Sequence, residues 1–82
     1  MSSPRVVLYT RAGCHLCDEA RPVVAQVAAE AGEQWVEVDV DTDPVLVARH
    51  GEYVPVVTVD GVQQAFWRVE APRLRRALGV TG

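Results

Sequence analysis

Two cysteines separated by two residues carry the most specific chemistry in this sequence. Cys14 and Cys17 are its two cysteines, and His15 and Leu16 lie between them. A disulfide between residues so close would enclose a very small loop and would remove little entropy from the unfolded chain. A disulfide that only stabilises the fold is therefore a poor explanation for the two cysteines. Redox chemistry and metal binding remain.

The position of the pair favours redox chemistry. Residues 5–10 form an apolar run that predicts a buried strand, and from Cys14 to Ala31 apolar residues recur at intervals of three and four, as in a helix. The cysteines would then lie in its first turn, where free backbone N–H groups and the helix dipole stabilise an anion. We expect Cys14 to be substantially ionised at neutral pH and to attack, and the more buried Cys17 to resolve the mixed disulfide.

A metal site is the main alternative to redox chemistry. Zinc in proteins usually has four ligands, and beyond the two cysteines only His15 and His50 add softer donors. His15 is wedged between the cysteines, and His50 stands alone at the end of another predicted helix. We therefore expect no metal site within one chain. Inert core cysteines, or a chance spacing on an unrelated fold, are further alternatives.

The remaining segments predict an α/β domain that spans residues 1–82. Strands are predicted at residues 34–40, 55–60 and 63–67, and helices at residues 44–50 and 73–78. In the first of these strands the valines should form a buried face. Asp43 is the expected N-cap of the helix that begins at Pro44, and Asp60-Gly61 predicts a hairpin turn. The long helix contains Pro22, where we expect a kink.

The resulting order is β-α-β-α-β-β-α. The first two strands, joined by a helix, should be parallel, and the last two should form an antiparallel hairpin. The expected fold is a four-stranded mixed sheet with helices on both faces.

Composition excludes several classes of function. The net charge is −3, and eight arginines are scattered among eleven acidic residues, so we expect no nucleic-acid partner, because that requires clustered positive charge. The apolar runs are too short for a membrane span, and the N-terminal run is too short for a secretory signal. We expect a cytoplasmic monomer that does not associate with a membrane.

Two stretches resemble glutaredoxins. Residues 8–17 look like the strand, loop and CxxC motif that open these proteins, and residues 53–61 look like their Val-Pro strand and hairpin. Trp67 and the Ala-Pro-Arg-Leu-Arg segment at residues 71–75 are similar to the end of short bacterial glutaredoxin-like proteins. The resemblance covers nearly the whole chain. It implies a thioredoxin-like fold and a thiol–disulfide oxidoreductase or electron carrier that uses Cys14 and Cys17.

The resemblance also implies a substrate-binding surface. The Val54–Pro55 bond would be cis, the loop would face the CxxC motif, and the backbone of Val54 would pair with an extended substrate chain. Arg11 stands where glutaredoxins commonly have lysine, and it would stabilise the Cys14 thiolate and attract a carboxylate of the substrate. His15 replaces the usual proline and, if cationic, would raise the thiolate fraction. For Arg11 and His15, an ordinary solvent-exposed side chain without a part in the reaction is an equal alternative. For Pro55 the alternative is an ordinary proline of an edge strand.

One departure from the family concerns glutathione. Glutathione-binding glutaredoxins have two glycines and an aspartate after the hairpin, whereas residues 65–70 carry side chains here. The co-substrate could therefore be glutathione or another low-molecular-weight thiol. Glu70 is expected to cap the last helix, and Trp67 to pack or to line the substrate groove.

We expect no bound cofactor. The substrate would be a disulfide-bearing protein or a small thiol, and a thiol or a reductase would donate electrons. The alternatives are a non-catalytic protein-binding module around Val54–Pro55, or a metal or iron–sulfur carrier in which two chains each supply Cys14.

Overall fold

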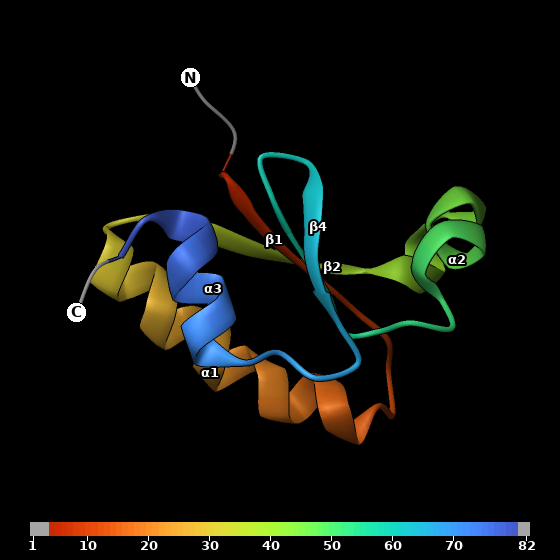
Figure 1. The fold of residues 1–82 in the computed structure, drawn as a ribbon. Helices are drawn as coiled ribbons and strands as arrows, with labels where there is room; N and C mark the ends of the chain where they lie inside the picture. The colour runs from red at the N-terminus through yellow and green to blue at the C-terminus, as the bar shows by residue number, and fades with distance from the viewer. Residues whose placement is uncertain (1–3, 81–82) are drawn as a thin grey trace.

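The computed structural model describes residues 4–80, which form a four-stranded sheet with three α-helices (Figure 1). Residues 1–3 and 81–82, which include the start of the N-terminal segment and the end of the predicted domain, lie outside the described residues. In chain order the elements are β1 (Val6–Thr10), α1 (His15–Ala31), β2 (Trp35–Asp39), the 3-10 helix η1 (Val40–Thr42), α2 (Pro44–His50), β3 (Val56–Val59), β4 (Val62–Phe66) and α3 (Ala71–Leu78).

The strand order in the sheet is β2-β1-β3-β4, and it confirms the predicted mixed topology. β1 and β2 are parallel and are joined through α1, whereas β3 is antiparallel to both β1 and β4. Asp60 and Gly61 connect β3 to β4 with φ values of 54° and 82°. Two successive positive φ values are the geometry of the tight turn that matches the twist of a hairpin.

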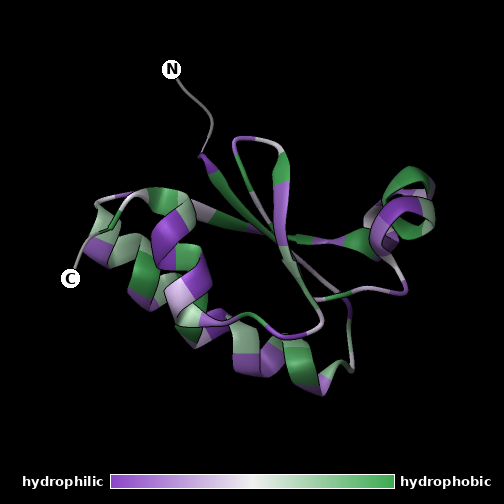
Figure 2. Ribbon diagram, in the orientation of Figure 1, coloured by the Kyte–Doolittle hydropathy of each residue, from purple (hydrophilic) through white to green (hydrophobic). Residues whose placement is uncertain are grey.

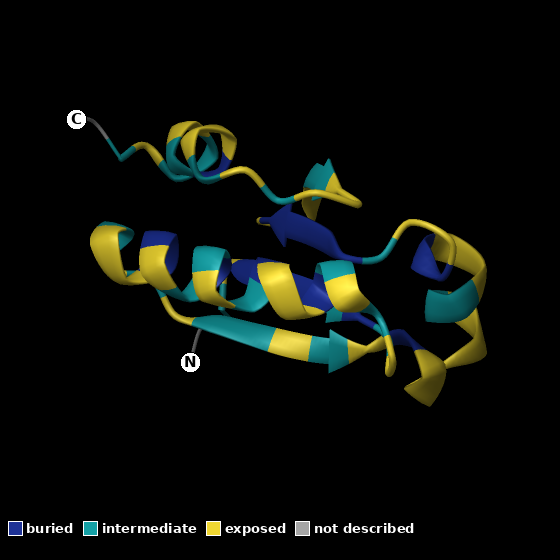
Figure 3. Cartoon of the chain, turned by 90° about the horizontal axis from the view of Figure 1, so that it is seen from below, coloured by how far each residue is buried: buried dark blue, intermediate teal, exposed yellow. Residues whose placement is uncertain are grey.

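The main core lies between the sheet and the helices α1 and α3. Alternate residues of β1 and β3 face these helices, as the period of two in a strand requires. The core cluster consists of Val6, Leu8, Ala20, Val24, Val27, Val57, Val59 and Leu74, all of them aliphatic. Figure 3 shows that burial is concentrated in the central strands, while the edge strand β2 and the outer side of α1 are more exposed.

The opposite face of the sheet has a thinner cover. Tyr9 points to this face, and its ring centroid lies 4.5 Å from that of His50 at the end of α2. Helices therefore lie on both faces, but α2 sits beyond the ends of β1 and β2 (Figure 1). Val36 and Val38 of β2 are half-buried and Val40, which follows the strand, is fully buried, so the predicted valine face is buried in part. The reason is that β2 is an edge strand.

The helix α1 begins where the cysteine spacing predicts. Cys14 is its N-cap residue, and the helix continues through Pro22 to Ala31. Apolar and polar segments follow one another along it (Figure 2), and its buried residues recur at intervals of three and four: Cys17, Ala20, Val24, Val27 and Ala28. Gly32 ends it in the left-handed conformation, with φ of 69°, which glycine adopts without steric cost. Asp43 caps α2 as predicted, because its side chain accepts a hydrogen bond from the N–H of Val45.

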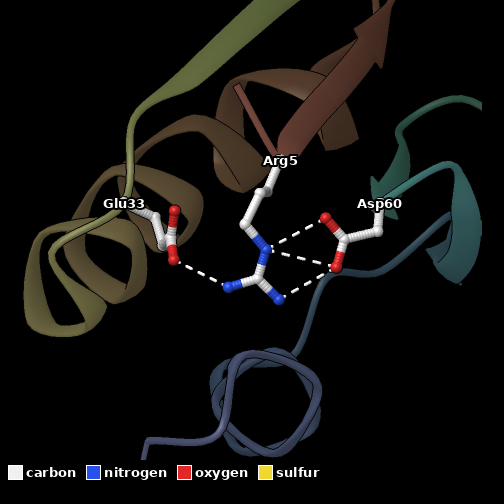
Figure 4. Close-up of polar contacts among 3 residues, drawn as sticks. All are labelled: Arg5, Glu33 and Asp60. Atoms are coloured by element: carbon white, nitrogen blue, oxygen red, sulfur yellow. Dashed lines mark hydrogen bonds and ion pairs between the residues drawn. The ribbon is translucent and has the colours of Figure 1, made fainter. Parts of the chain in front are cut away.

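Charged side chains close the end of the sheet where β1 begins. The Arg5 guanidinium binds Glu33 with 2.7 Å from Nη1 to Oε2, and Asp60 with 2.9 Å from Nη2 to Oδ2 (Figure 4). The Asp60 N–H also donates to the Arg5 carbonyl at 2.9 Å. These contacts join the start of β1, the α1–β2 loop and the hairpin turn. Across residues 4–80, no helix is both long and apolar enough to cross a membrane.

Candidate active site

Cys14 lies at the N-terminus of α1, between a tight loop and the first helical turn. Its N–H donates to the Arg11 carbonyl at 3.3 Å, and Gly13 supplies the positive φ of 78° that the loop requires. The Cys14 Sγ accepts a hydrogen bond from the backbone N–H of Cys17 at 3.3 Å. The side chain is partly exposed, and the thiol is not joined to Cys17. The sulfur therefore takes the position where a helix presents N–H groups to an anion.

Cys17 has the opposite environment. Its side chain is fully buried on the core side of α1. Burial, a side-chain hydrogen bond to Cys14 and the charge on Cys14 together raise the pKa of Cys17 to about 12. The positive charge of Arg21 acts in the opposite direction. The two sulfurs are thus neighbours with different accessibility, and the buried one is held protonated.

A polar network lies next to Cys17. Arg21, one turn further along α1, donates from Nε to Glu37 Oε1 at 2.7 Å and also pairs with Asp18. The other Glu37 oxygen accepts from the Thr10 hydroxyl at 2.8 Å, and the hydrogen bond from Arg21 lowers the pKa of Glu37. Sequence analysis missed this network. The signal was present, since an arginine four residues after a helical cysteine lies on the same face.

Arg11 binds a carboxylate and a carbonyl of two later segments of the chain. Its Nε lies 3.1 Å from both carboxylate oxygens of Asp41, and its Nη1 donates to the Gly51 carbonyl at 3.4 Å. The guanidinium therefore pairs with a carboxylate rather than with the Cys14 sulfur. Close packing fixes this loop, because a Cβ on Gly51 would lie 2.6 Å from the Val47 carbonyl oxygen and 3.3 Å from Arg11 Nη1.

The other expected substrate-binding residues lie at the same end of the sheet. His15 is the first residue of α1 and is exposed, whereas Val54 is half-buried and Pro55 is buried just before β3. The Val54–Pro55 peptide bond is cis. Because β3 runs antiparallel to β1, its start lies beside the end of β1 that leads to Cys14.

Trp67 connects the two halves of this site. Its backbone N–H donates to the Tyr53 carbonyl and its Nε1 to the Glu52 carbonyl, both at 3.0 Å. Its side chain also lines a surface hollow together with Leu16 of the CxxC motif. The loop before Val54–Pro55 and the start of α1 therefore meet at Trp67.

Glu70 and the candidate metal ligands were also singled out from the sequence. Glu70 occupies the N-cap position of α3, but its side chain makes no capping hydrogen bond, so the predicted capping was wrong. Glutamate is a weak N-cap compared with the shorter polar residues. Within the described residues, no group of three or more His, Cys, Asp or Glu side chains lies close enough to hold a metal. His50 is instead buried against Tyr9.

Comparison with known proteins identifies the family. The family described as Glutaredoxin-like domain (DUF836) matches residues 5–79. The chain belongs to this family. The glutaredoxin-like chain is also 39% identical, over 80 residues, to the uncharacterized proteins Rv0508 of Mycobacterium tuberculosis and Mb0520 of Mycobacterium bovis. The match covers 92% of this chain and 82% of each relative.

Solved structures confirm the fold. Protein XcR50 from X. campestris superposes with a TM-score of 0.74 at 35% identity, covering 94% of this chain and 99% of the other. Ne2328 from Nitrosomonas europaea gives 0.75 at 20% identity with 94% of each chain covered. Fasciola hepatica thioredoxin gives 0.62 at 22% identity, covering 90% and 76%. The predicted glutaredoxin-like family and thioredoxin fold are thus confirmed, and with the adjacent Cys14 and Cys17 they indicate a redox role.

Proposed function

We propose that this glutaredoxin-like chain is a thiol–disulfide oxidoreductase in which Cys14 attacks and Cys17 resolves. The observation that carries the proposal is the asymmetry of the two thiols. Cys14 Sγ is partly exposed at a helix N-terminus and accepts the Cys17 N–H at 3.3 Å, whereas Cys17 is fully buried beside it. An accessible nucleophile with a protected partner is what a two-step exchange requires.

The reaction has two balanced steps. The Cys14 thiolate attacks one sulfur of the substrate disulfide, a mixed disulfide forms, and the other substrate sulfur leaves as a thiolate. Cys17 then loses its proton and attacks Cys14 Sγ, which closes the Cys14–Cys17 disulfide and releases the second substrate thiolate. Two electrons pass from the dithiol to the substrate, and the released thiolates take up protons according to their own pKa values.

The surroundings of Cys17 favour its ionisation at the second step. In the free dithiol, the charge on Cys14 is one of the causes that raise the pKa of Cys17. That charge disappears when Cys14 enters the mixed disulfide, while the positive charge of Arg21 remains. Cys17 therefore ionises more readily at the stage at which it must attack.

The substrate side follows from the position of the cis-proline loop. We propose that the Val54 backbone pairs with an extended segment of the substrate, beside the buried ring of Pro55. The proposed reaction uses no bound cofactor. A low-molecular-weight thiol or a reductase would restore the dithiol by the same exchange in reverse.

Ellman's reagent tests the two roles separately, because each exchange releases one coloured thiolate. The reduced wild-type chain should release two per chain, since Cys17 displaces the second from Cys14. Cys17→Ser should release one and retain the other as a stable adduct, visible by mass spectrometry. Cys14→Ser should release almost none while folded, because Cys17 is buried.

Turnover is tested by reduction of insulin with dithiothreitol as the donor. The wild type should accelerate the reaction, and both serine variants should return it to the background rate. A wild-type rate equal to that of Cys14→Ser would overturn the proposal and favour the binding module. Colour and metal content of protein purified without oxygen would reveal an iron–sulfur carrier.

A further inference from the structure

Aromatic side chains gather at the surface beside the thiols. The sequence contains one Phe, two Trp and two Tyr residues. Three of these, Tyr53, Phe66 and Trp67, form a cluster with ring centroids 5.1 to 6.4 Å apart. Each is exposed, at 45%, 45% and 52% respectively. We call these three residues the aromatic rim. Clustered exposed aromatics are unusual on a surface without a partner and are enriched at the centres of protein interfaces.

The rim is rigidly held rather than loosely exposed. Trp67 has a left-handed backbone conformation with φ of 62°, which is uncommon for a residue other than glycine. Two hydrogen bonds of 3.0 Å, from its backbone N–H to Tyr53 and from its Nε1 to Glu52, fix both the backbone and the ring. Strained and well-fixed residues concentrate at functional sites, and a ring ordered in advance loses little entropy when it binds a partner.

The rim is continuous with the CxxC motif. Leu16, between the two cysteines, lines a shallow apolar hollow together with Phe66, Trp67 and Arg68. A second hollow shares Leu16, Trp67 and Arg68 with the first and is lined by both apolar and charged residues, namely Ala20, Val23, Val69, Glu19 and Glu70. A disulfide that reaches Cys14 therefore brings the groups next to its sulfur onto this apolar surface.

The apolar lining of the hollow favours a protein segment over a small charged thiol as the occupant. Glutathione carries two carboxylates and no apolar side chain to cover the rim. Arg11 is already bound to Asp41, with 2.9 Å between Nη2 and Oδ1, and the one cation in the lining of the hollow, Arg68, stands beside three apolar residues, Leu16, Phe66 and Trp67. An apolar side chain on the rim instead removes aromatic surface from water, which is favourable without any charge partner.

We infer that the aromatic rim and Leu16 form a docking surface for an extended segment of a disulfide-bearing protein. The segment carries a large apolar residue next to its reactive cysteine. This inference rests on the proposed function, since it names the substrate class of the same dithiol. Trp67 is the specificity-determining residue, and it acts by contact with the neighbour of the substrate cysteine rather than by touching the reacting sulfurs.

Two disulfide-linked peptides test the inference. They have blocked termini and equal charge and differ only in Leu or Ser before the cysteine; glutathione disulfide is the third substrate. The wild type should show a kcat/KM about 10-fold higher for the Leu peptide than for the Ser peptide, the range expected for one apolar contact. Trp67→Ala should abolish this preference by lowering the kcat/KM for the Leu peptide to that for the Ser peptide.

Further variants separate docking from folding. Trp67→Phe should retain most of the preference, and Leu16→Ser should reduce it without altering the rim itself. Val62→Ser, a 60% exposed position at the far end of the hairpin, should have no effect. Equal kcat/KM for the two peptides in the wild type, or an equal loss for all substrates in Trp67→Ala, overturns the inference. Failure of the wild type with every peptide and with Ellman's reagent would instead overturn the proposed function.

Discussion

The two ends of the central sheet differ in what they leave exposed. At the end where β1 begins, Arg5 binds Glu33 and Asp60 and joins three segments. At the end where β1 stops, Arg11 is likewise paired, with Asp41, but Cys14 and Trp67 stay exposed in part. We call these the paired end and the thiol end. The difference fits the proposal that the thiol end meets an external molecule.

The distribution of side-chain types follows the same division. The core cluster between the two ends is entirely aliphatic, whereas the aromatic rim lies outside it at the thiol end. Aromatic side chains bury more surface than aliphatic ones and usually strengthen a core. Their position beside the CxxC motif is what the inferred docking surface would require.

The largest expected effect concerns the two thiols. Cys17 is fully buried, and this burial is the largest cause that raises its pKa, whereas Cys14 is partly exposed. Iodoacetamide at pH 8 should therefore label Cys14 in folded Cys17→Ser at least about 100-fold faster than it labels Cys17 in folded Cys14→Ser. A mass-spectrometric time course measures both rates, and the difference should vanish in guanidinium chloride. Equal rates in the folded proteins would refute the asymmetry.

The next effect compares the core with the rim. Leu8 is fully buried in the core cluster, so Leu8→Ala should lower the free energy of unfolding by about 2–5 kcal/mol. Trp67→Ala should lower it by no more than about 1 kcal/mol, because the indole is half exposed. Urea denaturation followed by circular dichroism measures both. A comparable loss for the two variants would mean that the rim is structural.

A smaller effect tests the network beside Cys17. Arg21→Gln removes the positive charge that favours the Cys17 thiolate, so release of the second thiolate from Ellman's reagent should slow about 3- to 10-fold, while the first release keeps its rate. Arg75→Gln is the matched control, since Arg75 pairs with Glu30 and has no contribution to Cys17. Stopped-flow absorbance resolves the two phases. An unchanged second phase would separate Arg21 from the resolving step.

The pH dependence of stability supplies a weaker test at the thiol end. Burial lowers the pKa of His50 below its ordinary value of 6.5. The unfolded chain therefore binds this proton more tightly, and the free energy of unfolding should fall as the pH decreases from about 6.5 through the lower pKa of the folded state. His50→Gln should flatten this slope in urea titrations. A slope that survives in His50→Gln would assign it to other groups.

The smallest effect is expected at the paired end. Arg5 is exposed, so its ion pairs with Glu33 and Asp60 are screened by water and salt. Arg5→Gln should shift the urea midpoint only slightly, and 0.5 M NaCl should make the variant and the wild type more alike. The rates with Ellman's reagent should not change. A larger loss of unfolding free energy in Arg5→Gln than in Leu8→Ala would contradict the division between core and ends.

Local patterns predicted most of the elements. The period of three and four from Cys14 to Ala31, Asp43 before Pro44, and Asp60-Gly61 each specify a structure through neighbouring backbone groups. What local patterns could not give depends mostly on distant partners. Asp41 binds Arg11 across 30 residues of chain, and the valine face of the second strand is buried only in part because that strand lies at the edge of the sheet. The predicted Glu70 cap failed locally.

The sequence by itself determined the order of the main elements, the family and the place of the CxxC pair at a helix start, because periodicity, caps and the CxxC spacing act over a few residues. Tertiary structure alone decided that Arg21 binds Glu37, that Arg11 binds Asp41, and that Trp67 stands beside Leu16. These features arise where segments far apart in the chain meet. Burial and charge pairing depend on the residues that surround a side chain in space, and these are not its neighbours in the sequence.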